Sequence, residues 1–142
     1  MTRTAHDRMT DIPITVTFGT PKEFSKSLKK HGVKDDINVS TNRGYAVKTS
    51  EKAGGGHHLF AYISKADWDE RDSYATIAHE AFHLLIYIHM IMEGGERELT
   101  IYTPQHESFA YHFDTIFQAI FRVVRDAKAS EFAKPKKSKM KA

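Results

Sequence analysis

The chain contains no cysteine among its 142 residues, and this absence limits the cross-links and metal sites that it can form. Without thiols, neither a disulfide framework nor a thiolate metal site can form. A bound metal ion must therefore be held by histidine nitrogens and carboxylate oxygens. Nine histidines and eighteen acidic residues provide such groups.

A long apolar segment is missing from the start of the chain. Residues 1–8 are mostly polar, so no secretion signal is predicted there. The longest apolar run, residues 73–92, is interrupted by three histidines and a glutamate, which argues against a membrane span. We therefore expect a cytoplasmic protein without a membrane partner.

The composition is that of one compact domain, with 40% hydrophobic and 11% aromatic residues. We assign this domain to residues 1–133. Residues 134–142 form a lysine-rich tail, which we expect to be disordered and which accounts for the net charge of +3. No nucleic-acid-binding motif accompanies the tail, so a nucleic-acid partner is not expected.

The most informative pattern is His79-Glu80-Ala81-Phe82-His83, a His-Glu-x-x-His motif. On a helix, residues four apart project from the same face, so the two imidazoles can converge on one zinc ion. The glutamate lies beside that face and can act as the general base for a water molecule. The motif therefore predicts a zinc-dependent hydrolase, with Glu80 as the catalytic residue.

The residues around the motif predict the helix that this geometry requires. No proline or glycine occurs between Asp72 and Gly94, and Gly94-Gly95 is a typical helix end. Apolar residues occur nearly all round this helix, which indicates a helix enclosed by protein. A glutamate in such surroundings costs free energy unless a cation compensates it, and this favours the metal site.

A catalytic zinc ion keeps three protein ligands, so a third must come from elsewhere. A second helix is predicted from Pro104 to about Ala129. Glu107 falls on the flank of its apolar stripe, as a site at the rim of the core would require. His106 falls within the stripe and is the alternative, because imidazole is the commoner zinc ligand. Spacing alone leaves both open.

The motif region resembles a known class of enzymes. Thr76–Leu85 fits the extended zincin pattern, and a glutamate 24 residues beyond His83 resembles the gluzincin arrangement. More narrowly, Glu107-Ser108-Phe109-Ala110-Tyr111 after such a helix looks like the small metallopeptidases assigned to tailed bacteriophages. The resemblance implies a zinc metallopeptidase in the host cytoplasm, acting on a peptide or protein, with ligands His79, His83 and Glu107.

Further polar residues are candidates for supporting roles. Tyr102, Tyr111 and His112 could donate a hydrogen bond to the oxyanion of the reaction. Asp114 could orient a ligating imidazole. Each of these side chains also suits an exposed position on a helix surface.

The order of elements predicts an α+β fold with a small antiparallel or mixed sheet. Apolar residues alternate with polar ones over residues 12–18, which predicts a half-buried strand. Residues 45–49 and 59–63 are predicted as further strands. A short helix follows the capping box at Thr20–Glu23. With the two long C-terminal helices packed on one face, this is a minimal zincin-like domain. The resemblance gives residues 59–63 the role of the edge that binds an extended peptide.

The motif is also consistent with a second class of function. Zinc could pin the two long helices together in a non-catalytic interaction or assembly module, such as a factor of phage or host. A closed structural site would have a fourth protein ligand and no base, so Glu80 distinguishes the two.

Overall fold

The computed structural model describes residues 1–33, 43–49, 56–66, 70–92 and 106–133. For residues 70–72, 106–109, 132 and 133, it describes the backbone only. The predicted tail (134–142) and Tyr102 lie outside the described residues.

Four strands form one mixed sheet, which confirms the predicted fold class. The strands are β1 (Thr2–His6), β2 (Pro13–Gly19), β3 (Gly44–Lys48) and β4 (Leu59–Ser64), in the spatial order β1-β2-β4-β3. β2 and β4 run parallel, whereas β1 with β2 and β3 with β4 run antiparallel. Strand β1 was not predicted, because its five residues are all exposed and carry no hydrophobic alternation.

The expectation that residues 12–18 form a half-buried strand is wrong, because β2 is buried on both faces. Ile14 and Val16 face one apolar cluster, while Thr15 and Thr17 are buried on the opposite face. The Thr15 hydroxyl lies 2.7 Å from that of Thr4 on β1, which satisfies its hydrogen-bonding capacity. The threonines that alternate with apolar residues in β2 are therefore buried because their hydroxyl groups pair with threonine hydroxyls of β1.

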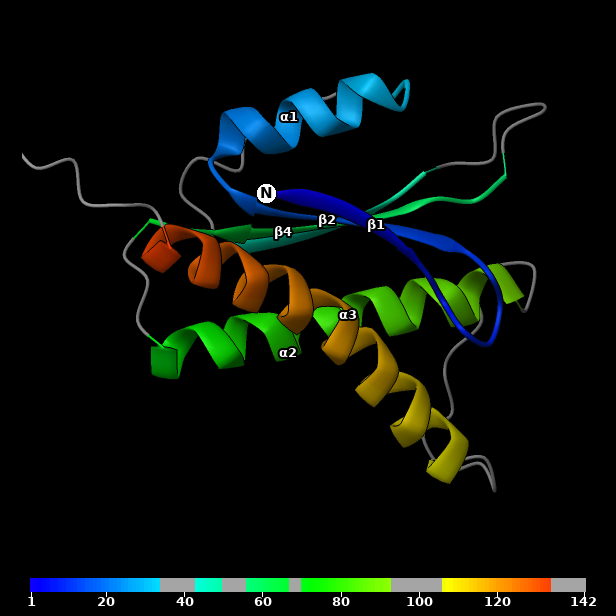
Figure 1. The fold of residues 1–142 in the computed structure, drawn as a ribbon. Helices are drawn as coiled ribbons and strands as arrows, with labels where there is room; N and C mark the ends of the chain where they lie inside the picture. Colours follow the sequence, from blue (N-terminus) through cyan, green and yellow to red (C-terminus); the bar gives the residue numbers. More distant parts are fainter. Residues whose placement is uncertain (34–42, 50–55, 67–69, 93–105, 134–142) are drawn as a thin grey trace, which may run out of the picture.

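The three helices cover both faces of the sheet (Figure 1). Helix α1 (Pro21–Lys30) packs on one face, and α2 (Glu70–Met92) and α3 (His106–Ala133) pack on the other. The two long helices share one face of the sheet, as predicted, whereas α1 lies on the other face. Its buried residues Phe24 and Leu28 need an apolar partner of their own, which Phe60 and Tyr62 of β4 provide. The predicted cap is confirmed, since the Thr20 side chain accepts a hydrogen bond from the Glu23 amide.

Helix α2 packs beneath β3 and β4 and against α3. Its buried residues Ile77, Ala81, Leu84, Leu85 and Ile88 pack within the larger apolar cluster. Its outer side is open to solvent, however, and Phe82 is 45% exposed. By length and composition alone, residues Ser73–Met92 are long and apolar enough to cross a membrane. In this fold the segment contacts β3, β4 and α3.

Candidate metal centre and active site

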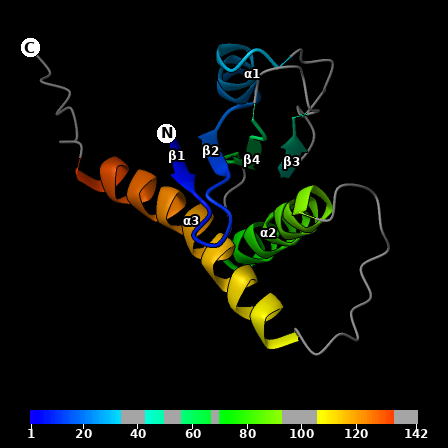
Figure 2. The ribbon, with the colours of Figure 1, turned by 90° about the vertical axis from the view of Figure 1, so that its right-hand side faces the viewer.

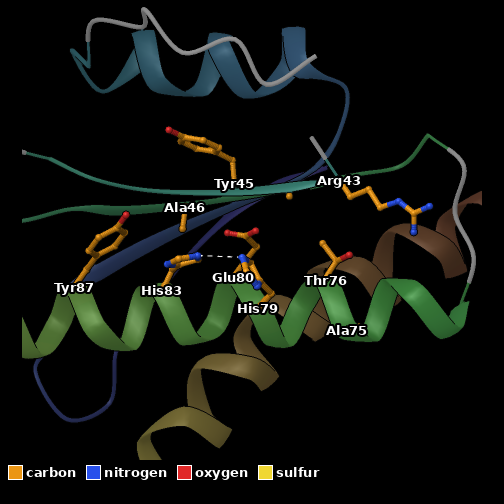
Figure 3. A pocket seen from close by; sticks show the side chains of 10 residues that line it. Arg43, Tyr45, Ala46, Ala75, Thr76, His79, Glu80, His83 and Tyr87 are labelled. Carbon is orange, nitrogen blue, oxygen red and sulfur yellow. Dashed lines mark hydrogen bonds between the residues drawn. The ribbon is translucent and has the colours of Figure 1, made fainter. Parts of the chain in front are cut away.

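The two motif histidines converge on the side of α2 that faces β3 (Figure 3). The Nε2 atoms of His79 and His83 lie 3.0 Å apart, with the ring planes at 77°. Two imidazoles bound to one tetrahedral zinc ion, at about 2.0–2.1 Å each, place their nitrogens roughly 3.3 Å apart. This pair of nitrogens therefore fits two positions of a zinc site. The i, i+4 spacing on a continuous helix produces the fit.

Glu80 lies beside the pair and is buried. Its side chain extends from α2 toward β3, next to the imidazoles (Figure 3). Only 4% of the residue is exposed, and burial raises the pKa of its carboxyl group to about 7. A carboxyl group with this pKa can take up and release a proton near neutral pH, as a general base must.

Gly44 gives the Glu80 carboxyl its space. This glycine begins β3 and faces α2 at close range. A Cβ atom at this position would lie 2.9 Å from Oε1 of Glu80 and 2.8 Å from Cγ2 of Thr76. Any other residue would push the strand and the helix apart, so the missing side chain lets the carboxyl lie against the backbone of β3.

These groups line one cavity of about 720 Å³ between β3 and α2 (Figure 3). The strand side contributes Arg43, Gly44, Tyr45 and Ala46, and the helix side contributes Ala75, Thr76, His79, Glu80, His83 and Tyr87. The Tyr45 ring turns away from α2, so its backbone forms the wall. The cavity thus combines two imidazoles, a buried carboxyl and a strand edge.

The electrostatics favour a neutral imidazole at His83. Burial lowers the pKa of its ring, and the nearby His79 lowers it further. A neutral imidazole has a free lone pair, which is the form that binds a metal ion. At neutral pH the ring is therefore ready to act as a ligand.

The described part of the chain contains two of the three predicted ligands. The side chains of Glu107 and His106 lie outside it, and among the described side chains no group of three His, Asp or Glu residues could hold a metal ion. The first turn of α3 extends beyond α2 on the side away from the sheet (Figures 1 and 2). The imidazoles of His79 and His83 face β3, so a ligand from that turn would have to reach the other side of α2.

The other predicted supporting residues lie away from this cavity. Tyr111 is 69% exposed on α3, and Asp114 lines a second cavity between β1 and α3. His112 is buried, with its Nε2 atom 2.7 Å from Oδ1 of Asp7. None of these three residues lines the cavity beside Glu80.

Sequence reasoning identified only His79, Glu80 and His83 among the residues that line the cavity, and it missed Tyr87 and Gly44 in particular. Tyr87 follows His83 by four residues, so the spacing that linked the two histidines could also have identified it. No sequence pattern identified Gly44, because the need for a glycine there arises from its contact with α2, which begins 26 residues later in the chain.

The predicted peptide-binding edge is also wrong. Strand β4 (Leu59–Ser64) lies between β2 and β3, and both of its edges are paired along their length. Within the described sheet, β3 is the edge strand on this side, and it lines the cavity. The order of strands in space differs from their order in the chain, so nearness to the motif in sequence did not identify the edge.

Comparisons with known proteins give no match. No family model matches the sequence, and neither a curated protein nor a solved structure is significantly similar to it.

Proposed function

We propose that this protein is a zinc-dependent peptidase. The observation that carries the proposal is the buried carboxyl of Glu80 beside two converging imidazoles, in a cavity bounded by a strand edge. A structural pair of histidines has no need of a buried acid with a pKa of about 7 beside it.

His79 and His83 would hold the ion. The 3.0 Å separation of their Nε2 atoms, and the chemistry of two nitrogen donors with a neighbouring carboxyl, fit zinc. The resemblance to gluzincins makes Glu107 the third ligand in this proposal, with His106 as the alternative. Bound zinc supplies Lewis-acid activation of water and of the peptide carbonyl.

Glu80 would move the proton. Its carboxylate takes a proton from the attacking water as the new oxygen–carbon bond forms, and the carbonyl electrons move onto oxygen. When the carbon–nitrogen bond breaks, Glu80 passes that proton to the leaving amine. Burial suits both steps, because it keeps the pKa of the group close to neutrality.

An extended peptide would bind along β3. The strand is at the edge of the described sheet, and Gly44 to Ala46 line the cavity with their backbone close to Glu80. Strand addition supplies backbone hydrogen bonds that do not depend on the peptide sequence. A peptide bond lying across Gly44 would be within reach of the Glu80 carboxyl.

Zinc content and turnover test the proposal together. The unaltered chain, Glu80→Gln and a matched surface control, Glu131→Gln, would be compared for zinc by elemental mass spectrometry. Cleavage of a mixed peptide library would be followed by mass spectrometry. We expect all three proteins to bind zinc, and Glu80→Gln alone to lose cleavage. Undiminished cleavage by Glu80→Gln would exclude the mechanism.

The alternative is a zinc-containing interaction or assembly module without catalysis. The contact between α2 and α3 favours it, since an ion with ligands from both helices would stabilise the fold directly. In that case Glu80→Gln retains zinc, and neither the unaltered chain nor the variant cleaves any peptide of the library.

A further inference from the structure

The cavity contains a phenol on the same face of α2 as the two histidines. Residues 79, 83 and 87 are spaced four apart, so their side chains form one row along the helix. The rings of His83 and Tyr87 lie 6.4 Å apart between centroids, with planes 25° apart. Stacking against His83 therefore restricts the direction of the Tyr87 side chain.

The Tyr87 hydroxyl group points into the space between α2 and β3 (Figure 3). The residue is half-buried, and its ring contacts the apolar core while its hydroxyl end faces the cavity. Within the described residues this hydroxyl makes no hydrogen bond. It is therefore available to a ligand in the cavity.

We propose that Tyr87 donates this hydrogen bond to the oxyanion formed during peptide hydrolysis, an inference that rests on the proposed function. The oxyanion arises when water adds to the carbonyl carbon, Glu80 accepts the water proton, and the carbonyl electrons move onto oxygen. A phenol is protonated at neutral pH and can donate to that oxygen. When the electrons return, the carbon–nitrogen bond breaks and the amine receives the proton from Glu80.

The position of Tyr87 suits this role better than the residues considered from sequence. Glu80 and Tyr87 lie seven residues apart on the same helix, close to two full turns, so both reach the cavity from one rigid element. A carbonyl group placed beside the two imidazoles would lie between the Glu80 carboxyl and the Tyr87 hydroxyl. A donor on α3, such as Tyr111, is exposed away from this cavity.

Ligand binding to the zinc-loaded chain tests the inference without an activity assay. The probe is an N-phosphoryl-leucyl dipeptide, whose tetrahedral phosphoryl oxygens resemble the charged intermediate. A thiol-bearing dipeptide, which has no such oxygens, is the comparison ligand. Affinities for zinc and for both ligands would be measured by titration calorimetry on the unaltered chain, Tyr87→Phe and Tyr74→Phe. The last variant removes the same atom from α2 outside the cavity.

We expect Tyr87→Phe to bind the phosphoryl dipeptide roughly 10- to 100-fold more weakly, because a hydrogen bond to a charged oxygen is lost. Its affinity for zinc and for the thiol dipeptide should stay within about twofold, and Tyr74→Phe should match the unaltered chain. Equal phosphoryl affinity in Tyr87→Phe, equal losses for both ligands, or no phosphoryl binding by the zinc-loaded chain would overturn the inference. Failure of the unaltered chain to bind zinc would instead refute the proposed function, and the inference with it.

Discussion

Glu80 is a carboxyl group that the fold keeps away from water. Ionising it inside the protein costs free energy, because burial removes the solvent that stabilises the charge. Its pKa of about 7, against 4.5 for an ordinary glutamate, expresses that cost. The chain therefore retains a destabilising residue, as functional sites commonly do.

The first prediction concerns Glu80→Gln in the metal-free chain. In the unfolded chain the carboxyl ionises near pH 4.5 and in the folded chain near pH 7, so the folded state loses stability as pH rises between them. The substitution should stabilise the protein by about 1 kcal/mol at pH 5 and about 3 kcal/mol at pH 8. Urea unfolding in the presence of a chelator measures the change in the free energy of unfolding at each pH, with Glu131→Gln as the control. A gain independent of pH would contradict the burial argument.

The second prediction concerns Gly44→Ala. The new Cβ would lie 2.9 Å from Cγ and Oε1 of Glu80, so we expect a loss of about 1–3 kcal/mol in the free energy of unfolding. Gly56→Ala is the matched control, since nothing lies within 4 Å of its Cβ position. In the Glu80→Ala background the loss at Gly44 should shrink, which a double-mutant cycle measures. Strictly additive losses would mean that the two residues do not share this space.

At the scale of elements, a buried hydrogen-bonded pair joins α3 to the start of the sheet. The side chains of Asp7 and His112 are 1% and 4% exposed, and their Oδ1 and Nε2 atoms lie 2.7 Å apart. Burial alone would raise the pKa of Asp7, but hydrogen bonds from His112 and Thr10 outweigh it and hold the pKa below its usual value. The pair thus fixes the turn between β1 and β2 against α3.

The third prediction follows from that pair. His112→Ala leaves the Asp7 carboxylate buried without its partner, so we expect the free energy of unfolding to fall by about 3–5 kcal/mol. Because the folded pKa of Asp7 is depressed, its contribution is present above the unfolded pKa and is lost as pH falls through the folded value. Urea unfolding at pH 7 and at pH 3 should show a smaller loss at the lower pH.

The exposed pair of Arg3 and Asp126 provides the control for this prediction. It also joins β1 to α3, but solvent screens it. Asp126→Asn should therefore have a much smaller effect than His112→Ala. Equal effects of the two substitutions would show that the buried pair adds nothing beyond the exposed one.

At the scale of the whole molecule, bound zinc would connect α3 to the cavity between α2 and β3. The fourth prediction is that the protein binds about one zinc ion per chain and that zinc raises its melting temperature, because a ligand that binds only the folded state stabilises it. His83→Ala should abolish the rise. Differential scanning calorimetry with and without a chelator measures it.

Two further variants identify the third ligand in the same experiment. If Glu107 ligates zinc, then Glu107→Ala loses the ion while His106→Ala keeps it. The first turn of α3 then approaches the imidazoles of His79 and His83 in the zinc-loaded protein. The reverse result assigns the position to His106. Zinc retained by both variants would place the third ligand elsewhere in the chain.

The sequence by itself determined the features that depend on local spacing. The i, i+4 rule placed His79 and His83 together, and the absence of proline and glycine between Asp72 and Gly94 predicted that segment as a helix. The Thr20 cap and three of the four strands were likewise predictable, because caps and alternating patterns involve residues a few positions apart.

Only the tertiary structure decided which distant segments meet. The position of β4 inside the sheet, the packing of α1 on the opposite face and the existence of β1 all depend on pairing across the chain. Gly44 matters because α2 packs against it, and His112 faces Asp7 because a turn 105 residues away lies beside it. Such contacts follow from how layers pack and from strand order, which no local periodicity encodes.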